Sequence, residues 1–228
     1  MKALILAGGM GKRLRPLTNS IPKPMVKVGG KPIIFWQIRW LMANGIDRFV
    51  LLGGYRASKL VSYIKSMGMS GSFEFSIEDR QLGSAGAISN ARKFVEHEKE
   101  FLIVNGDNIT DLNIARLRLN GRELACLAVV PYRSSKSLVS IKNRRIIGFE
   151  DRPFIGGYWY NAGVLLMGSK ALKSLPGSGR LEEDVFPKLA SGGRLSCAKF
   201  TGSYFNSIDS IKDAEEVDKD IRSGKVRL

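Results

Sequence analysis

Short apolar runs and amphipathic segments alternate along the first half of the chain. The apolar runs have the length of buried strands and lie at 3–7, 49–52, 73–77 and 101–104. Segments with apolar residues at helical spacing lie between or after them, at 32–44, 59–67 and 88–95. Strands that alternate with helices are joined by crossover connections and run parallel. We therefore predict an α/β fold with a mostly parallel central sheet and flanking helices.

From about residue 121 the pattern becomes rich in strands. The runs that predict them lie at 124–130, 138–141, 145–149, 158–167 and 195–200. The second and third of these runs predict a hairpin around Asn143, and a closing helix is expected at 210–221. The complete fold is then a mixed, mostly parallel sheet with a small β-rich lobe.

The charge of the chain is strongly basic, with a formal net value of +15 over 228 residues. Such a charge suits a polyanionic partner. However, the basic residues are dispersed, and no stretch alternates them with aromatic side chains, as binding of single-stranded nucleic acid prefers. We expect a basic surface with a phosphate-handling site, and no nucleic-acid partner.

The two cysteines and the short apolar runs indicate the cellular compartment of the protein. Cys126 and Cys197 lie in apolar surroundings without a C-x-x-C pair, so we expect two buried free thiols in a reducing compartment. The run 124–130 is too short to span a bilayer, and 3–7 is too short for a signal peptide. We expect a cytoplasmic protein without a membrane partner, in which the single His97 is solvated.

A glycine-rich loop follows the first predicted strand and contains Gly8, Gly9 and Gly11. Five basic residues and no acidic one come next, at Lys12, Arg13, Arg15, Lys23 and Lys27. Glycines let the backbone approach a ligand closely, and exposed N–H groups in such turns bind anions. The chemistry that this stretch predicts is phosphate binding.

Two common phosphate-binding motifs do not fit the loop. A Walker A motif would need Gly at Leu6 and a hydroxyl side chain at Arg13. The dinucleotide-binding fingerprint would need a third glycine at Leu14.

The stretch instead resembles the signature of the sugar nucleotidyltransferases, L-A-G-G-x-G-T-R-L-x-P-L-T followed by P-K-P-M/L and G-K-P. The matching segments here are 6–18, 22–25 and 30–32, and Lys12 replaces the usual Thr. The resemblance implies a Rossmann-like fold and catalytic roles for Arg13 and Lys23. It also implies nucleotide binding by these residues of the loop: Leu6, Ala7, Gly8, Gly9, Gly11 and Lys12.

A second glycine-rich loop, Leu-Gly-Ser-Ala-Gly at 82–86, resembles the family's L-G-T-A-G element and implies that Gly83 and Ser84 face the nucleotide. Uracil- and thymine-using relatives have Gln where this chain has Glu78. A carboxylate only accepts hydrogen bonds, so it suits guanine N1–H and N2–H₂ or the cytosine amine. Alternatively, Glu78 caps the following loop without meeting the base.

The resemblance also implies a Mg²⁺ cofactor. The family's G-D element falls on Gly106 and Asp107, just past a predicted strand, and implies that Asp107 holds the metal and the nucleotide. A second metal carboxylate falls on Ser207 in the W-x-D frame of many relatives. It falls on Asp209 in the M-D-T-L-R-D frame of glucose-1-phosphate cytidylyltransferases, which matches without a gap. We assign Asp209, which alternatively caps the helix at 210–221.

Sugar-phosphate contacts are implied by three further elements, F-x-E-K-P, N-A-G and L-E-x-D. They place these contacts on Gly106, Asp151, Arg152, Asn161, Gly163 and Glu182. Asp151 and Arg152 replace the family's Glu and Lys, which changes reach and geometry and leaves the sugar open.

The resemblance therefore implies a Mg²⁺-dependent enzyme that joins a nucleoside triphosphate and a sugar 1-phosphate, releasing pyrophosphate. We expect one domain over 1–228, with nucleotide binding in about 1–120, sugar binding in about 121–228 and no C-terminal β-helix. Exposed aromatic residues at 154–160 would suit a homo-oligomer interface. Two alternatives stay open: a cytidylyltransferase of the same fold that acts on a non-sugar phosphate, and a non-catalytic regulatory subunit.

Overall fold

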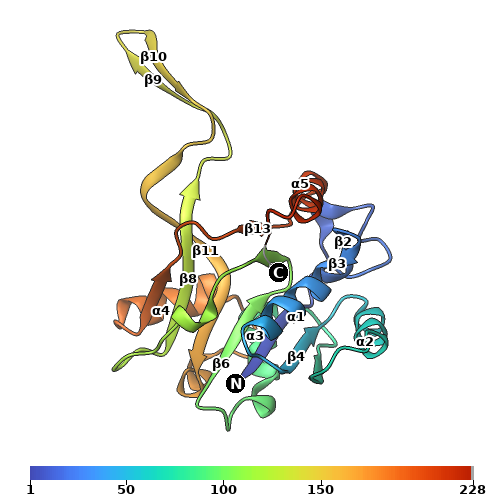
Figure 1. Ribbon diagram of the computed structural model, residues 1–228. Helices are drawn as coiled ribbons and strands as arrows, with labels where there is room; N and C mark the ends of the chain where they lie inside the picture. Colours follow the sequence, from blue (N-terminus) through green and yellow to red (C-terminus); the bar gives the residue numbers. More distant parts are fainter. Residues whose placement is uncertain (227–228) are drawn as a thin grey trace.

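A seven-stranded sheet forms the centre of the computed structural model, which describes residues 1–226 (Figure 1). The last two residues of the predicted domain, 227 and 228, lie outside the described residues. The strand order is β12-β8-β11-β6-β1-β4-β5. All neighbouring pairs are parallel except the two that involve β11, which runs antiparallel to β6 and β8. The predicted mixed, mostly parallel sheet is confirmed.

The strands of this sheet are β1 Lys2–Ala7, β4 Arg48–Gly53, β5 Ser72–Ile77, β6 Glu100–Asn105, β8 Ala125–Arg133, β11 Phe154–Gly168 and β12 Leu195–Lys199. Smaller two-stranded sheets pair β2 Lys27–Val28 with β3 Lys31–Pro32, β7 Asn108–Thr110 with β13 Phe205–Ser207, and β9 Leu138–Lys142 with β10 Arg145–Glu150. The helices are α1 Ile33–Ala43, α2 Ala57–Ser66, α3 Gly83–Asn90, α4 Phe186–Ser191 and α5 Ile211–Arg222. None of the helices within 1–226 is long and apolar enough to cross a bilayer.

Helices cover both faces of the sheet, which explains why its central strands are apolar runs. Alternate residues of β1 point to opposite faces, so Ile5 packs in one hydrophobic cluster with α1 and α2, and Leu4 packs in the other with α3 and α4. A third cluster packs Val217 of α5 against Leu14 of the glycine-rich stretch and Ile208. The C-terminal helix is thereby fixed beside the N-terminal loop.

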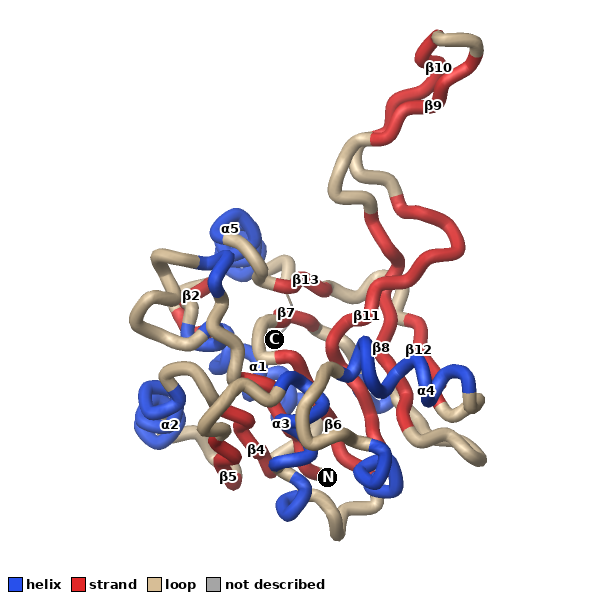
Figure 2. The backbone as a smooth tube through the Cα atoms, turned by 180° about the vertical axis from the view of Figure 1, so that it is seen from behind, coloured by secondary structure: helices blue, strands red, loops and turns tan. Residues whose placement is uncertain are grey.

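The predicted β-rich half joins the same sheet through β8, β11 and β12. Strand β13 pairs with β7 instead, and β9 and β10 form a hairpin that projects far from the body (Figures 1 and 2). Asn143 and Arg144 have φ values of 46° and 66° in the turn, as a tight two-residue hairpin requires, and the predicted hairpin is confirmed.

The predicted helix at 88–95 is wrong in its bounds. Helix α3 begins earlier, within the second glycine-rich loop, and only a 3₁₀ turn, Arg92–Phe94, follows it. A Cβ on Gly83 or Gly86 would overlap the backbone of residues 177–179. Small residues therefore let the helix start pack against a distant segment, which local periodicity does not reveal.

The prediction of two buried thiols is half wrong. Cys126 is buried, whereas Cys197 is exposed because β12 is an edge strand of the sheet. His97 is solvated as predicted, with its side chain 93% exposed.

Gly106 is pressed against β1, where its N–H donates to the carbonyl oxygen of Leu6 at 2.9 Å. A Cβ at this position would overlap the same oxygen. We expect Gly106→Ala to lower the free energy of unfolding by about 1–3 kcal/mol, measured by denaturant titration, because backbone must shift. Gly177→Ala, which would meet open space, should leave stability nearly unchanged. Equal stability of both variants would contradict this packing.

Candidate functional site

The predicted site residues of the first half gather at the carboxyl edge of the parallel strands. The loop 8–11 follows β1, Gly54 follows β4, Glu78 follows β5, and Gly106 and Asp107 follow β6. Ligands of open α/β sheets bind at this edge, outside the strand ends. Leu6 and Ala7 form the end of β1 and support the loop from below.

The glycine-rich loop has little room for side chains at its end. Gly11 adopts φ 61°, and its carbonyl oxygen accepts a hydrogen bond from the Thr18 hydroxyl at 2.8 Å. A Cβ on Gly11 would lie 2.9 Å from Thr18 Cγ2 and 3.2 Å from Lys23 Cβ. Gly9 faces open space, and Lys12 is exposed in the 3₁₀ turn that follows. The loop is therefore open to a ligand on one side and held by packing on the other.

Lys23 joins two carboxylates that come from distant parts of the chain. Its Nζ lies 2.6 Å from Asp107 Oδ2 and 2.8 Å from Asp209 Oδ1. Arg13 donates to the same Asp209 oxygen at 2.7 Å. The Lys23 side chain is 13% exposed and that of Arg13 is 75% exposed. Lys23 is therefore largely buried, whereas Arg13 faces solvent. We call these four residues the Lys23 cluster.

The contacts of the cluster shift the pKa values of Lys23 and Asp209 in the directions that favour their charged forms. Burial alone would lower the pKa of Lys23, but Asp107 and Asp209 outweigh it and raise that pKa above its ordinary value. Burial alone would raise the pKa of Asp209, but its bonds to Lys23 and its attraction to Lys23 and Arg13 hold that pKa below its ordinary value.

Asp107 has one oxygen to spare. Its Oδ1 is buried and has no hydrogen-bond partner among the described residues. A buried carboxylate oxygen without a partner is unusual and costly. Mg²⁺ binds through one or two carboxylates plus substrate phosphates, and no larger group of metal-binding side chains occurs within 1–226. The pair Asp107 and Asp209 thus fits a magnesium ion by its donor type and number.

Asp209 reaches the cluster because β13 pairs with β7, and the Ile208 N–H donates to the carbonyl oxygen of Asp107 at 2.9 Å. The N-cap of α5 is Ser210, which forms a capping box with Asp213, so the alternative role of Asp209 as N-cap is wrong. Ser207 lies at the same place, with its hydroxyl 3.4 Å from Asp209 Oδ2.

Glu78 lies at the carboxyl edge of the sheet, just after β5, and also caps a loop. Its Oε2 accepts a hydrogen bond from the Leu82 N–H at 3.2 Å, while its Oε1 would lie within 2.8 Å of a Cβ on Gly8 or Gly54. Burial raises its pKa, and the Leu82 N–H opposes that rise. The capping contact is present, and it leaves Oε1 beside the first glycine-rich loop.

The second glycine-rich loop is bound to the segment that follows residue 177. Gly83 adopts φ 76°, and the Ser84 hydroxyl accepts a hydrogen bond from the Leu181 N–H at 2.9 Å. Leu181 begins a single π-helical turn, Leu181–Val185, which leads into α4. Ser84 thereby fixes the position of Glu182.

Three predicted sugar-phosphate residues, Asn161, Gly163 and Glu182, line one narrow cleft next to Asn105. Gly163 has φ 61°, and its N–H donates to Asn161 Oδ1 at 3.0 Å. The glycine is required because a Cβ would overlap the amide of Asn105. The sheet therefore brings the predicted residues of β11, Asn161 and Gly163, against Asn105 at the end of β6.

Asp151 and Arg152 do not line this cleft and lie where the projecting hairpin returns to the body. Asp151 accepts a hydrogen bond from the Ser137 hydroxyl at 2.7 Å, and the carbonyl oxygen of Arg152 accepts one from Arg133 Nε at 2.6 Å. In this structure both residues serve the base of the hairpin.

Tyr160 is a site residue that sequence reasoning missed. Its ring packs on Phe205 with a centroid distance of 5.6 Å. Burial raises its pKa first, and the charges of Asp209 and Asp107 raise it further, so its hydroxyl lies within reach of the charge of the carboxylate pair. The only signal in the sequence was its place directly before Asn161.

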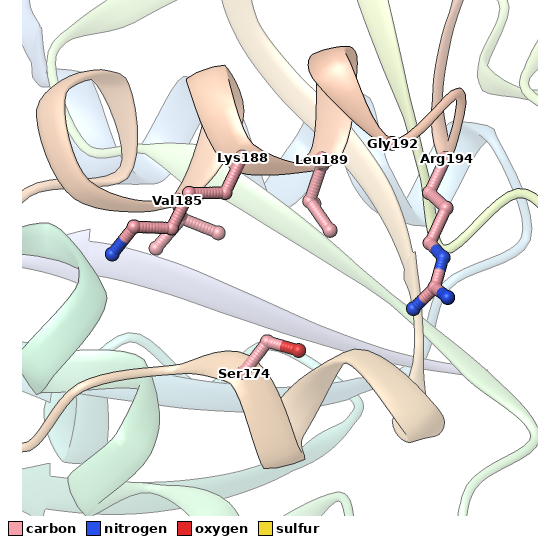
Figure 3. Close-up of a pocket in the computed structure, with 6 residues that line it drawn as sticks. All are labelled: Ser174, Val185, Lys188, Leu189, Gly192 and Arg194. Atoms are coloured by element: carbon pink, nitrogen blue, oxygen red, sulfur yellow. The ribbon is translucent and has the colours of Figure 1, made fainter.

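A larger pocket lies away from these residues, between α4 and the 3₁₀ turn Ser169–Ser174 (Figure 3). Its walls include Ser174, Lys188 and Arg194, and none of the predicted site residues lines it. The Lys23 cluster therefore does not belong to this pocket.

The chain matches the Nucleotidyl transferase family over residues 2–224 and belongs to that family. A mannose-1-phosphate guanyltransferase of Aspergillus fumigatus is 33% identical over 90% of this chain and 60% of its own length. A D-glycero-alpha-D-manno-heptose 1-phosphate guanylyltransferase of Campylobacter jejuni is 31% identical over 73% of this chain and 76% of its own. The chain spans about three fifths of the length of relatives such as the Aspergillus enzyme.

Among solved structures, HddC from Yersinia pseudotuberculosis superposes with a TM-score of 0.76 at 26% identity, covering 96% of this chain and 99% of that one. A second HddC structure is a complex with GMP-PN and gives a TM-score of 0.73 at 25% identity over the same shares of the two chains. These comparisons confirm the family resemblance and the fold class.

The contact between Lys23 and Asp209 predicts that the pKa of Asp209 changes when the charge of Lys23 is removed. Lys23→Met removes the main attraction on Asp209 and leaves burial to act, so we expect the pKa of Asp209 to rise. In the native protein this low pKa contributes stability above about pH 3.9 that is lost as the pH falls through the native pKa. Carboxyl-carbon NMR titration measures the shift directly. Arg222→Met, which removes the distant partner of Asp218, should leave the Asp209 titration unchanged, and an unchanged titration in Lys23→Met would refute the pairing.

Proposed function

We propose that this chain transfers a nucleotidyl group from a nucleoside triphosphate to a sugar 1-phosphate, giving a nucleotide-diphosphate sugar and pyrophosphate. The observation that carries the proposal is the Lys23 cluster at the carboxyl edge of the sheet, between a glycine-rich loop and the Asn161–Glu182 cleft. Family membership and the names of the relatives support the same reaction class.

The reaction needs positioning and positive charge more than an activated nucleophile. An oxygen of the sugar phosphate is already an anion and forms the new bond to the α-phosphorus. The bond from that phosphorus to the oxygen bridging to the β-phosphate breaks, and pyrophosphate leaves with the electron pair. Arg13 and Lys23 would neutralise the charge that develops, and the loop at Gly8, Gly9 and Gly11 would hold the triphosphate.

Asp107 and Asp209 would hold Mg²⁺, for which the unpartnered Oδ1 of Asp107 is the support. When bound, the ion would neutralise phosphate oxygens as a Lewis acid. Lys23 contacts both carboxylates and helps to hold the pKa of Asp209 below its ordinary value, so the pair would be preorganised for the ion.

The sugar phosphate would lie at the cleft of Asn161, Gly163 and Glu182, which Asn105 also lines. Gly106, the next residue in the chain, would contact it from the turn after β6. Asn161 and Glu182 supply the polar groups that read hydroxyls. Asp151 and Arg152 would join only if the projecting hairpin changed its position relative to the body, because they lie at its base.

Guanine is the base that we propose. Glu78 presents Oε1 beside the first loop while Oε2 is engaged by Leu82, and a free carboxylate oxygen accepts from guanine N1–H or N2–H₂. The two curated relatives are named guanyltransferases, and one HddC structure contains GMP-PN.

The cytoplasm is the compartment that we propose, because its reducing conditions suit the free thiols Cys126 and Cys197. A homo-oligomer is the quaternary state that we propose, on the basis of exposed side chains such as Phe154 and Tyr158.

The test is pyrophosphate release from a grid of nucleoside triphosphates and sugar 1-phosphates, with and without Mg²⁺. We expect metal-dependent release with GTP and a hexose or heptose 1-phosphate. Arg13→Ala or Lys23→Ala should lower kcat on the order of a hundredfold, because each removes a positioned charge.

A matched control is Arg39→Ala, which removes an exposed guanidinium from α1 and should keep the wild-type rate. Silence across the whole grid from folded protein would favour a non-sugar substrate or a regulatory subunit. A near-wild-type rate for Arg13→Ala would refute its assignment.

Glu78→Gln separates the two roles of that residue. If Oε1 reads guanine, kcat/KM for GTP should fall by about 10- to 100-fold, the loss expected for a hydrogen bond to a charged group, while UTP improves. A pure capping role predicts reduced stability in urea with an unchanged ratio of GTP to UTP rates.

A further inference from the structure

Helix α1 carries a buried polar residue, Gln37, among apolar neighbours. The Gln37 side chain is 2% exposed, and Ile34, Ile38 and Leu41 of the same helix belong to the hydrophobic core. A polar side chain in such a place is costly unless it forms hydrogen bonds. The bonds that Gln37 forms therefore indicate why a polar residue stands there.

The amide nitrogen of Gln37 donates two hydrogen bonds, both to the backbone. One goes to the carbonyl oxygen of Asn105 at 2.7 Å, and the other goes to the carbonyl oxygen of Asn108 at 3.0 Å. These two residues flank the turn between β6 and β7, which consists of Gly106 and Asp107. One buried group thus joins both ends of the turn that carries a carboxylate of the Lys23 cluster.

An amide suits this pair of acceptors for a chemical reason. The amide nitrogen of Gln carries two N–H groups without a charge, whereas a protonated carboxyl group carries one donor and an ionised one carries none. The orientation of the amide follows from the same chemistry, because the reversed orientation would place Oε1 against two carbonyl oxygens. The two bonds therefore require the amide nitrogen at this place.

The amide oxygen of Gln37 shows that the residue is not there for packing alone. Its Oε1 is buried and has no hydrogen-bond partner within residues 1–226. Such an atom is costly, and a Met side chain would fill a similar space without it. The two bonds to the turn explain why the polar side chain stands here, whereas the filling of space does not.

The turn itself lies between two other parts of the site. The side-chain amide of Asn108 donates to the carbonyl oxygen of Ala162 in β11 at 2.8 Å. The carbonyl oxygen of Asp107 accepts from the Ile208 N–H at 2.9 Å, next to Asp209. A displacement of the turn would therefore change the place of Asp107 relative to both the cleft and the second carboxylate.

Helix α1 also holds the segment that carries the cation. The N–H of Ile33, its first residue, donates to the carbonyl oxygen of Val26 at 2.9 Å. Val26 directly follows the 3₁₀ turn Lys23–Met25. One helix is therefore bonded to the segments of both Lys23 and Asp107, whose side chains meet at 2.6 Å.

We propose that Gln37 is a positioning residue that fixes the turn of Asp107 and thereby strengthens the binding of the magnesium ion. Its bonds go to backbone oxygens, so it acts through the turn. Asp107 then keeps Oδ2 on Lys23 and leaves Oδ1 for the ion. The link to the ion rests on the proposed function, whereas the hold on the turn can be measured without it.

The variant Gln37→Met removes both donors at similar side-chain size, and amide hydrogen exchange in the metal-free protein measures the turn directly. The Ile208 N–H should exchange about tenfold faster relative to the N–H groups of β4, the change expected when buried hydrogen bonds are lost. In the pyrophosphate assay, the Mg²⁺ concentration for half-maximal rate should rise about tenfold, as when an outer contact of a metal ligand is removed. Saturating Mg²⁺ should restore most of kcat.

The matched control is Trp40→Phe. Trp40 is 3% exposed on the same helix, and its Nε1 donates to the carbonyl oxygen of Leu112 at 2.9 Å, outside the turn. This variant loses a buried bond of the same kind from α1 and should lower the free energy of unfolding. The relative exchange of the Ile208 N–H and the Mg²⁺ requirement should stay as in the wild type.

Unchanged relative exchange of the Ile208 N–H in Gln37→Met, or an equal increase in Trp40→Phe, would overturn the proposal, since Gln37 would then serve the core alone. Faster exchange with an unchanged Mg²⁺ requirement would overturn the link to the ion. A folded protein that is silent in the pyrophosphate assay would refute the proposed function and the link to the ion with it. The exchange measurement would still decide whether Gln37 holds the turn.

Discussion

The Lys23 ammonium between Asp107 and Asp209 is the interaction on which the site depends. Two carboxylates that contact the same ammonium group would repel each other without it. Burial strengthens both this repulsion and the attraction of each carboxylate to the cation. The cation comes from the N-terminal loop, one carboxylate from the end of β6 and the other from the turn before α5. The pairing therefore joins segments from both ends of the chain at one edge of the sheet.

The hydrophobic packing beneath this cluster serves the same arrangement. Leu14, Ile208 and Val217 belong to one buried cluster, which holds α5 against the loop that carries Arg13 and Lys23. The capping box of Ser210 and Asp213 starts α5 just after Asp209 and leaves that carboxylate free to face the cations. The packing and capping residues are thus close neighbours in sequence of the charged residues that they hold in place.

Most of the fold was readable from local patterns, and the failures have a common cause. Buried strands such as β1 and β6 follow from short apolar runs, whereas the start of α3 depends on Gly83 and Gly86 meeting residues 177–179. The exposure of Cys197 depends on β12 being an edge strand. In the site, the motif matches predicted Lys23, Asp107 and Asp209. The place of Tyr160 beside the carboxylates, and of Asp151 at the base of the hairpin, is instead set by contacts between separate segments.

The one reversed strand has a consequence for how the chain is made. Strand β11 lies between β6 and β8, although β8 precedes it in the chain. While the polypeptide emerges from the ribosome, β1, β4, β5 and β6 are complete by residue 105, yet the outer edge of β6 stays without its neighbour until residues 154–168 are synthesised. Strand β8 has to wait for the same segment before it joins the sheet, and β12 waits for β8. The nascent chain therefore carries an open strand edge over about fifty residues of translation, the interval in which a chaperone would protect it.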